Sequence, residues 1–228
     1  MLTLPKLDPR LQMIFDMIPP CRVFADVGAD HAYLAIHLLS ANKIERAVIS
    51  EISPHALERA KRNIARLGLA ERCEFILADG LAGLPDDADV INISGMGADT
   101  MAGILARDKH KIWKQTLVLS PNRDIDIIRA ALLSFSYNAV SERVTMSKGR
   151  YYVAVRANPS DSAGNTDIAL GDMGVQNMCD PWLSYFRWRR GVHAATAPAL
   201  SSKSYEEALE WKNKLAQIDK RIRLLSQI

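Results

Sequence analysis

The sequence predicts an α/β fold in which a doubly wound, mainly parallel sheet is covered by helices on both faces and followed by a helical C-terminal extension. Three observations support this fold class. Short apolar runs alternate with segments of helical spacing, the first four runs stop at a glycine or an acidic residue, and the last helical segment carries a heptad repeat. With 228 residues, 48% of them hydrophobic, the chain can bury one substantial core and still form an appendage.

The N-terminal half is expected to begin the sheet with two strand–turn–helix units. The first apolar run, 23–27, breaks at Gly28, and apolar residues then recur at helical spacing over 33–39. The second unit repeats the pattern, and Pro54 favours a helix start because its missing N–H is not needed in the first turn. The expected elements of this half are strand 23–27, helix 33–39, strand 47–50 and helix 54–67.

The following segment is expected to complete the sheet. Because strands continue to alternate with helices, we expect a parallel sheet, and Pro121 stops its fifth strand. The last two β-rich pieces have no helix between them, so we expect them to pair antiparallel at one edge. The expected elements are strands 73–77, 88–94 and 117–120, helices 100–105 and 124–134, and edge strands 139–145 and 151–156.

Composition divides the chain into a sheet domain, 1–157, a linker, 158–174, and a tail, 175–228. The linker is rich in Ser, Asp, Gly and Asn. Apolar residues in the tail are spaced 3, 4, 3, 4 and 3 positions apart, which is typical of a coiled-coil seam. We expect an antiparallel helical hairpin, although a single helix docked on the sheet fits the same spacing. The seam is Ala208, Trp211, Leu215, Ile218, Ile222 and Leu225, and its partners are drawn from Val175, Met178, Trp182, Tyr185 and Phe186.

Composition also argues against several classes of protein. The three cysteines are widely spaced and contain no C-x-x-C pair, so we expect neither a metal site nor a disulfide framework. No apolar run approaches the roughly 20 residues that span a bilayer, and the N-terminus lacks a signal-peptide pattern, so we expect a cytoplasmic protein without a membrane partner. The tail holds nine Lys and Arg against five Asp and Glu, which is compatible with a polyanionic partner.

The carboxyl ends of the predicted strands carry the residues best suited to a ligand site. In an open α/β sheet, ligands bind outside these ends, where the first glycine turn lets the backbone approach closely. An acidic residue after the second strand, here Glu51, can accept hydrogen bonds from two neighbouring ribose hydroxyls. The strand ends hold Asp26, Gly28, Asp30, Glu51, Asp79-Gly80 and Gly95-Met96-Gly97.

The first turn favours S-adenosylmethionine over NAD as the ligand. A pyrophosphate requires a glycine-rich turn with free N–H groups, whereas Asp30 stands where the second glycine of the dinucleotide fingerprint is expected. A carboxylate repels a pyrophosphate but attracts the positive sulfonium and α-amino groups of S-adenosylmethionine. Asp79 is then expected to bond the adenine amino group, and Gly80 to leave room for the ring.

Four motifs in this order occur together in one known family. They are Asp26-Val-Gly-Ala-Asp-His-Ala-Tyr-Leu34, Asp79-Gly-Leu81, Ser94-Gly-Met-Gly97 and Pro121-Asn122. Together they resemble the TrmK family, bacterial methyltransferases that use S-adenosylmethionine to modify N1 of adenosine 22 in tRNA. The resemblance covers residues 7–156 by motif and the tail by pattern. It implies a Rossmann-like domain followed by a coiled-coil hairpin, with tRNA as the partner.

The chain departs from the family pattern at Ala98, where the family has a further glycine, at Ser120, where it has Gln, and in the tail. Several alternatives therefore stay open. A methyltransferase acting on rRNA or a small molecule keeps the cofactor and changes the acceptor. A non-catalytic RNA-binding module that senses S-adenosylmethionine keeps the fold and loses turnover, and an NAD-dependent oxidoreductase changes the cofactor.

Methyl transfer to an adenine nitrogen is an in-line displacement that mainly requires alignment of the reactants. We expect Asp30 to stabilise the developing positive charge or to accept a proton from the exocyclic amine, unless it only contacts the cofactor or caps a helix. Asn122 can donate and accept together and so read an adenine edge, unless it caps the next helix. The resemblance implies that Arg10 reaches the cofactor carboxylate. The residues expected to bind the cofactor are Arg10, Asp26, Gly28, His31, Glu51, Ile52, Asp79, Gly80, Gly95, Met96 and Gly97.

The basic tail is the expected contact for tRNA. Because N1 lies on the pairing edge of adenine, the base must be opened or flipped. Trp182, Trp188 and Trp211 are candidates for base stacking, although their seam spacing favours core packing. The seam can close within one chain or between two, and we favour a monomer. The expected phosphate contacts are Arg187, Arg189, Arg190, Lys212, Lys214, Lys220, Arg221 and Arg223.

Overall fold

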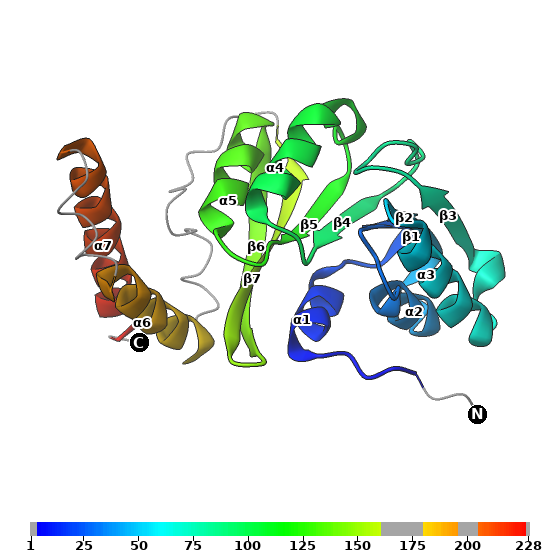
Figure 1. Cartoon of the computed structure of the whole chain (residues 1–228), viewed down its shortest axis with the longest axis horizontal. Coiled ribbons are helices and arrows are strands. Elements are labelled where there is room, and N and C mark those ends of the chain that lie inside the picture. The colour runs from blue at the N-terminus through cyan, green and yellow to red at the C-terminus, as the bar shows by residue number, and fades with distance from the viewer. Residues whose placement is uncertain (1–3, 161–179, 196–204, 227–228) are drawn as a thin grey trace. The chain divides into compact units, whose positions relative to one another are not determined.

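A computed structural model describes residues 4–160, 180–195 and 205–226 and confirms the predicted α/β class. Its seven-stranded sheet has the order β3-β2-β1-β4-β5-β7-β6 (Figure 1). All neighbouring pairs are parallel except those of β7, which runs antiparallel to both β5 and β6. The strands are β1 (Cys21–Val27), β2 (Ile44–Glu51), β3 (Cys73–Leu77), β4 (Val90–Ser94), β5 (Thr116–Ser120), β6 (Tyr137–Ser147) and β7 (Arg150–Pro159).

Helices cover both faces of the sheet, as a doubly wound fold requires. The first three helices pack on one face, and α4 and α5 pack on the other (Figure 1). These helices are α1 (Pro9–Met17), α2 (Tyr33–Ser40), α3 (Pro54–Arg66), α4 (Ala98–Arg107) and α5 (Ile125–Ser134), with the short 3-10 helices η1 (Ala70–Arg72) and η2 (Lys109–Lys111).

Helix α3 begins where the sequence predicts it, directly after the second strand. The Ser53 hydroxyl accepts a hydrogen bond from the N–H of Ala56 at 3.4 Å, and Pro54 occupies the first turn. One face of the helix, which includes Leu57 and Ile64, is buried. Arg59 and Asn63 of the same helix bond the loop that follows β1, at the carboxyl edge of the sheet, where the candidate site lies.

Helix α1 was not predicted from the sequence. The side chain of Asp8 caps it by accepting from the N–H of Leu11 at 2.9 Å, and Pro9 opens its first turn. Its buried residues, Met13, Ile14 and Met17, are spaced as one helical face. The Asp-Pro pair and this spacing are the sequence signals for the helix. The helix also brings Arg10 to the sheet.

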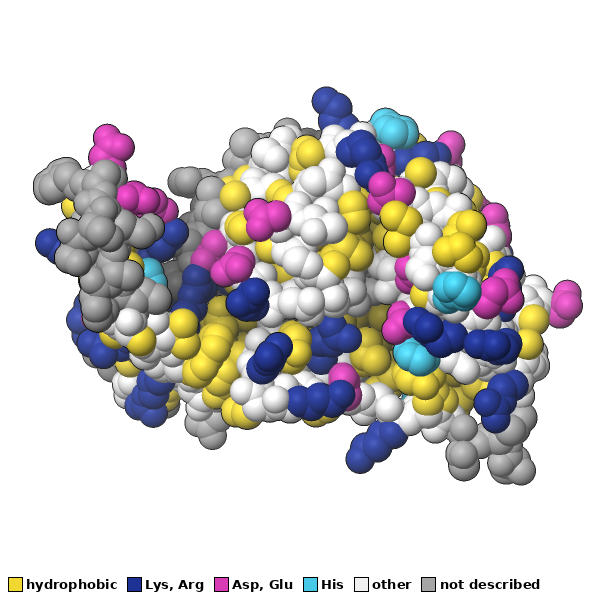
Figure 2. All heavy atoms as spheres, viewed as in Figure 1, with side chains coloured by type: hydrophobic (Ala, Val, Ile, Leu, Met, Phe, Trp, Pro, Cys, Tyr) yellow, Lys and Arg dark blue, Asp and Glu magenta, His cyan; other side chains and the backbone are white. Residues whose placement is uncertain are grey.

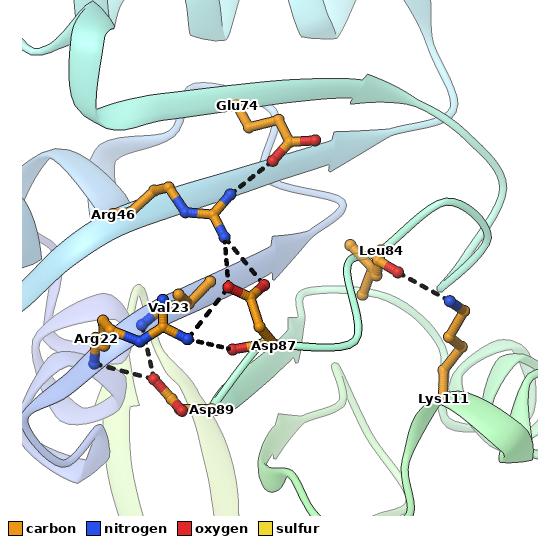
Figure 3. Close-up of polar contacts among 8 residues, drawn as sticks. All are labelled: Arg22, Val23, Arg46, Glu74, Leu84, Asp87, Asp89 and Lys111. Carbon is orange, nitrogen blue, oxygen red and sulfur yellow. Dashed lines mark hydrogen bonds and ion pairs between the residues drawn. The ribbon is translucent and has the colours of Figure 1, made fainter.

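Ion pairs join the strands at the amino-terminal edge of the sheet, opposite the candidate site (Figure 3). Arg46 lies 2.7 Å from Glu74 and 3.0 Å from Asp87, which also pairs with Arg22 at 3.1 Å. Asp89 accepts from the backbone N–H of Arg22 at 3.0 Å. The carboxylates of Glu74, Asp87 and Asp89 therefore all have cationic or N–H partners. Their contacts link β1, β2, β3 and the segment before β4.

The chain divides into two compact units, 1–164 and 165–228. The second unit contains α6 (Asp180–Ala195) and α7 (Tyr205–Leu225). Arg190 pairs with Asp219 at 2.5 Å, and the later residue His193 stacks on the earlier residue Trp211, so the two helices run antiparallel. The predicted helical extension is therefore present. No described helix is long and apolar enough to cross a membrane.

Several predicted features of the tail fall outside the described residues, among them Val175, Met178, the side chain of Ala208 and most of the linker. At the start of that linker, β7 extends to Pro159. Among the residues predicted for the seam and for its partners, the buried ones are Trp182, Tyr185, Phe186, Ile218 and Leu225.

Candidate functional site

Glu51, the last residue of β2, connects the first turn of the sheet to the start of α3. Its Oε2 accepts a hydrogen bond from the N–H of Asp30 at 3.2 Å, and its Oε1 accepts from the N–H groups of Ile52 and Ser53 at 3.0 and 3.2 Å. The residue is 8% exposed. Because each carboxylate oxygen can accept more than one bond, Glu51 retains acceptor capacity for a ribose while it holds the loop.

Asp26 lies one strand away, and its carboxylate is enclosed by the sheet. The amide of Asn92 on β4 donates to its Oδ1 at 2.7 Å, and the residue is 4% exposed. Burial raises the pKa of Asp26 to about 6; the bond from Asn92 opposes this shift, and the nearby Glu51 charge adds to it. Neither Asp26 nor Glu51 has a Lys or Arg partner in the described part of the chain. The two acids therefore leave a local negative charge uncompensated.

The oxygen of the Asn92 amide is buried and makes no hydrogen bond within the described residues. Its nitrogen is fully used, because it donates to Asp26 and also to the Ser94 hydroxyl at 3.2 Å. A buried acceptor without a donor is unfavourable, and such groups commonly mark a place that a ligand or ordered water completes. Its location beside Asp26 fits a ligand that carries hydrogen-bond donors and positive charge.

The two predicted glycine turns meet at this edge of the sheet. Gly28 has a φ of +73°, and a Cβ at this position would lie 3.1 Å from the terminal methyl of Met96. Gly95 has a φ of +82°, and a Cβ there would lie 2.8 Å from the guanidinium of Arg10. Arg10 also stacks over the ring of Tyr152 at 5.5 Å. The structure therefore brings Arg10, from the N-terminal helix, against the turn that follows β4.

Asn122 is held against the same turn from the other side. Its backbone N–H donates to the carbonyl of Met96 at 2.9 Å, and its side-chain amide donates to the carbonyl of Gly95 at 2.8 Å. The N-cap of α5 is Asp124, and no side chain caps that helix. The helix-cap alternative for Asn122 is thus wrong, and the residue as a whole is exposed.

Asp30 also does not cap a helix, because the N-cap of α2 is Ala32 and no side chain bonds there. Its carboxylate is half-exposed and pairs with Arg59 of α3. His31 is half-exposed, stacks on Tyr33 and lies 3.5 Å from the Asp30 carboxylate. Both predicted residues therefore lie on the exposed side of the loop whose backbone Glu51 holds.

The turn after β3 differs from the prediction in one respect. A Cβ at Gly80 would collide with the guanidinium of Arg107 and lie 2.9 Å from Asp108, so the space beside Gly80 is filled by the end of α4. Arg107 also binds the Asp79 carboxylate at 2.8 Å. In this structure Gly80 makes room for Arg107, and the prediction that it makes room for an adenine ring has no support here. The pairing was not predictable because the partners are 28 residues apart.

Two large apolar side chains are exposed beside Glu51. Ile52, a predicted cofactor residue, is 64% exposed, and Leu77 is 56% exposed. The residues Glu51 and Leu77 are direct neighbours across the β2–β3 ladder. Leu77 belongs to no motif, and its only signal in the sequence is an apolar residue at a strand end. Exposed apolar surface beside buried acids suits a ligand with both an apolar ring and polar groups.

The two departures from the family pattern are accommodated inside the fold. Ser120 is buried, and its hydroxyl donates to the carbonyl of Val153 at 3.1 Å. Ala98 is buried as the first residue of α4, directly after the N-cap Gly97. Both side chains therefore serve packing and hydrogen bonding in the structure, and neither changes the acids of the site.

Comparison with known proteins assigns the chain to a family. A family model described as a methyltransferase domain matches residues 7–155. A tRNA (adenine(22)-N(1))-methyltransferase of Bacillus subtilis is 33% identical over 172 residues, which cover 75% of this chain and 71% of the relative.

Solved structures agree with this assignment. The crystal structure of the B. subtilis m1A22 tRNA methyltransferase TrmK is 29% identical, with a TM-score of 0.78 and 99% of each chain covered. M. capricolum TrmK, in complex with S-adenosyl-homocysteine, is 26% identical with a TM-score of 0.81, and the match covers 96% of this chain and 99% of that one. The chain therefore belongs to the TrmK family of methyltransferases.

Proposed function

We propose that this chain transfers a methyl group from S-adenosylmethionine to N1 of an adenosine in tRNA, at position 22 as in its B. subtilis relative. The observation that carries the proposal is the enclosed pair Asp26 and Glu51 at the carboxyl ends of adjacent strands, uncompensated by any described cation. A positively charged adenosine compound is the ligand that such a pair suits. M. capricolum TrmK was solved in complex with S-adenosyl-homocysteine, which is S-adenosylmethionine without its transferable methyl group.

The site residues divide into two groups in this proposal. Asp26, Glu51 and the exposed Ile52 hold the cofactor from the β1–β2 side, and Arg10 over the Gly95 turn binds its carboxylate. Asp79 binds the adenine amino group once Arg107 shares or releases its carboxylate. The remaining proposed cofactor contacts are Gly28, His31, Met96 and Gly97. Asp30 and Asn122 face the acceptor base.

Charge conservation limits what these residues must do. When bound, S-adenosylmethionine supplies the methyl group together with the positive charge that passes to the base. The transfer from sulfur to N1 needs no proton transfer, so the residues need only align the base and accept its hydrogen bonds. The free Oδ1 of Asn122 and the carboxylate of Asp30 are acceptors suited to the exocyclic amine of adenine.

Basic side chains offer a surface for the RNA. Figure 2 shows Lys and Arg side chains, with few acidic ones among them, on the part of the first unit where Figure 1 shows α1 and the β6–β7 hairpin. The β6–β7 hairpin contributes Arg143 and Arg150 to this surface. Phosphate contacts of this kind position an RNA without reading its sequence.

The test is methylation of separate acceptor pools by the purified chain, with isotope-labelled cofactor and nucleoside mapping by mass spectrometry. We expect 1-methyladenosine in tRNA and no label in rRNA or metabolites. Asp30→Ala should abolish methylation and leave the dissociation constant for S-adenosylmethionine within about tenfold of wild type, because an acceptor on the base contributes to the transition state and little to cofactor binding. Label only in rRNA or in a metabolite would refute the tRNA proposal, and binding without turnover would refute the enzyme.

A further inference from the structure

The loop between β1 and α2 has an unfavourable backbone conformation. Asp30 and Ala32 have φ values of +45° and +56°, and Gly28, at +73°, precedes them. Residues with a Cβ rarely adopt this left-handed region, so the surrounding structure must hold the loop in place. The loop carries Asp30, the residue proposed to face the base, and its position is therefore set by whatever anchors it.

Helix α3 supplies two of these anchors from one face. Nε and Nη2 of Arg59 donate to the same oxygen of Asp30, Oδ1, at 3.2 and 2.5 Å. One helical turn later, the amide of Asn63 donates to the carbonyl of His31 at 3.1 Å. The third anchor is Glu51, which accepts from the N–H of Asp30 at 3.2 Å. Backbone and side chain of the loop are thus fixed from both sides.

The contacts with Arg59 distinguish the two carboxylate oxygens of Asp30. Oδ1 is occupied by the guanidinium, whereas Oδ2 lies 3.5 Å from Nε2 of the His31 ring. Oδ2 is consequently the oxygen with free acceptor capacity. An arginine restrains a carboxylate in this way better than a lysine does, since its planar fork has a fixed geometry.

We propose that Arg59 is a positioning residue for methyl transfer: by holding Oδ1 of Asp30, it directs Oδ2 toward the exocyclic amine of the target adenine. The inference rests on the proposed function. In the transfer, the N1 lone pair forms the new bond to the methyl carbon, the carbon–sulfur bond breaks with its electrons left on sulfur, and the positive charge moves to the base. Because no proton has to leave, a fixed acceptor is sufficient for the role of Asp30.

The experiment compares Arg59→Gln, Arg59→Lys and Asn63→Ala in the full-length chain, with Arg62→Gln as the matched control. Arg62 lies on the same helix, is exposed, and makes no hydrogen bond with the described residues, so its replacement removes the same charge without touching the loop. We expect Arg59→Gln to lower kcat about tenfold, with KM for tRNA and Kd for S-adenosylmethionine within about twofold. Arg59→Lys should recover part of kcat, and Arg62→Gln should match wild type.

A double-mutant cycle separates positioning from general stability. If Arg59 acts through Asp30, Arg59→Gln has no further effect on the residual rate of Asp30→Asn, whereas a merely structural role lowers both backgrounds equally. An equal loss in both backgrounds, or a parallel rise in Kd for S-adenosylmethionine, would overturn the inference.

Amide exchange of residues 28–32 gives a readout that does not depend on activity. It should speed up in Arg59→Gln and Asn63→Ala but not in Arg62→Gln, and unchanged exchange would overturn the anchoring. A wild-type chain that methylates nothing would refute the proposed function, while the exchange result would still decide whether α3 holds the loop.

Discussion

Asp26 shows how a single residue can oppose stability in order to serve a site. Its carboxylate is enclosed between strands, and burial raises its pKa from 3.8 in a free chain to about 6. The protonated form is therefore favoured by folding. The stabilising contribution of this group is complete below pH 3.8 and is lost as the pH rises through about 6. At neutral pH the buried charge destabilises the fold, and a bound cation would compensate it.

The variant Asp26→Asn should consequently be more stable than wild type at pH 8. The amide keeps an oxygen to accept the bond from Asn92 and removes the buried charge. The rise in the pKa of Asp26 from 3.8 to about 6 corresponds to at most about 3 kcal/mol. The difference in Tm between the variant and wild type should be larger at pH 8 than at pH 5. A difference that is equal at both pH values would contradict the assignment of the shift to Asp26.

Helix α1 shows how one element completes a site built by others. The turn after β4 is closed by Asn122 on one side, while α1 brings Arg10 over Gly95 on the other. The helix is buried through Met13, Ile14 and Met17, so its docking on the sheet fixes where Arg10 lies. Glycine is required at 95 both by its positive φ and by the close approach of the guanidinium.

Gly95→Ala tests this arrangement, and Gly68→Ala is its matched control. Both glycines have φ values near +70° to +82°, but a Cβ at Gly68 meets no atom within 4 Å. Each change should lower the free energy of unfolding by about 1 to 2 kcal/mol, the strain of a Cβ in the left-handed region. Only Gly95→Ala should also displace Arg10 and weaken cofactor binding, measured by calorimetry, to the level of Arg10→Ala. Equal cofactor affinity in both glycine variants would argue against a role for Arg10.

At the scale of the whole molecule, the second unit carries the cations that were predicted to contact the RNA phosphates, and only some of them are free of partners among the described residues of that unit. Of the eight basic residues predicted to contact phosphates, Arg190 and Lys214 form ion pairs, Arg189 donates to Tyr185, and Arg221 is buried. The other four are exposed and form no hydrogen bond or ion pair with the described residues: Arg187, Lys212, Lys220 and Arg223.

Replacing these four with Gln should weaken tRNA binding and reduce its salt dependence. Each lost phosphate contact lowers the slope of log K against log salt concentration by roughly 0.7 to 0.9. The slope can be measured by filter binding between about 50 and 200 mM salt, because phosphate contacts change the affinity strongly over this range. Lys214→Gln, whose partner is Glu210, is the control and should change the slope less. An unaltered slope in the fourfold variant would show that the tail does not contact the phosphates.

The succession of strands and helices along the chain, and the acidic residues at the strand ends, could be predicted from the sequence alone. Strand and helix patterns are local, because the spacing of apolar residues and the caps depend on neighbours a few positions apart. Since parallel strands end at one edge, Asp26 and Glu51 could be placed together without a structure. The local signal of α1 was also present, although the helix was not predicted.

Only the tertiary structure decided which side chains meet. Arg59 bonds Asp30 across 29 residues, Arg107 bonds Asp79 across 28, and Asn122 bonds Gly95 across 27. No periodicity relates such pairs, because their distance depends on how whole elements pack. The same packing encloses Asp26 and gives it a pKa of about 6, whereas its sequence neighbours would leave it an ordinary carboxylate. The chemistry of individual residues follows from the sequence, but their partners and their burial follow from the fold.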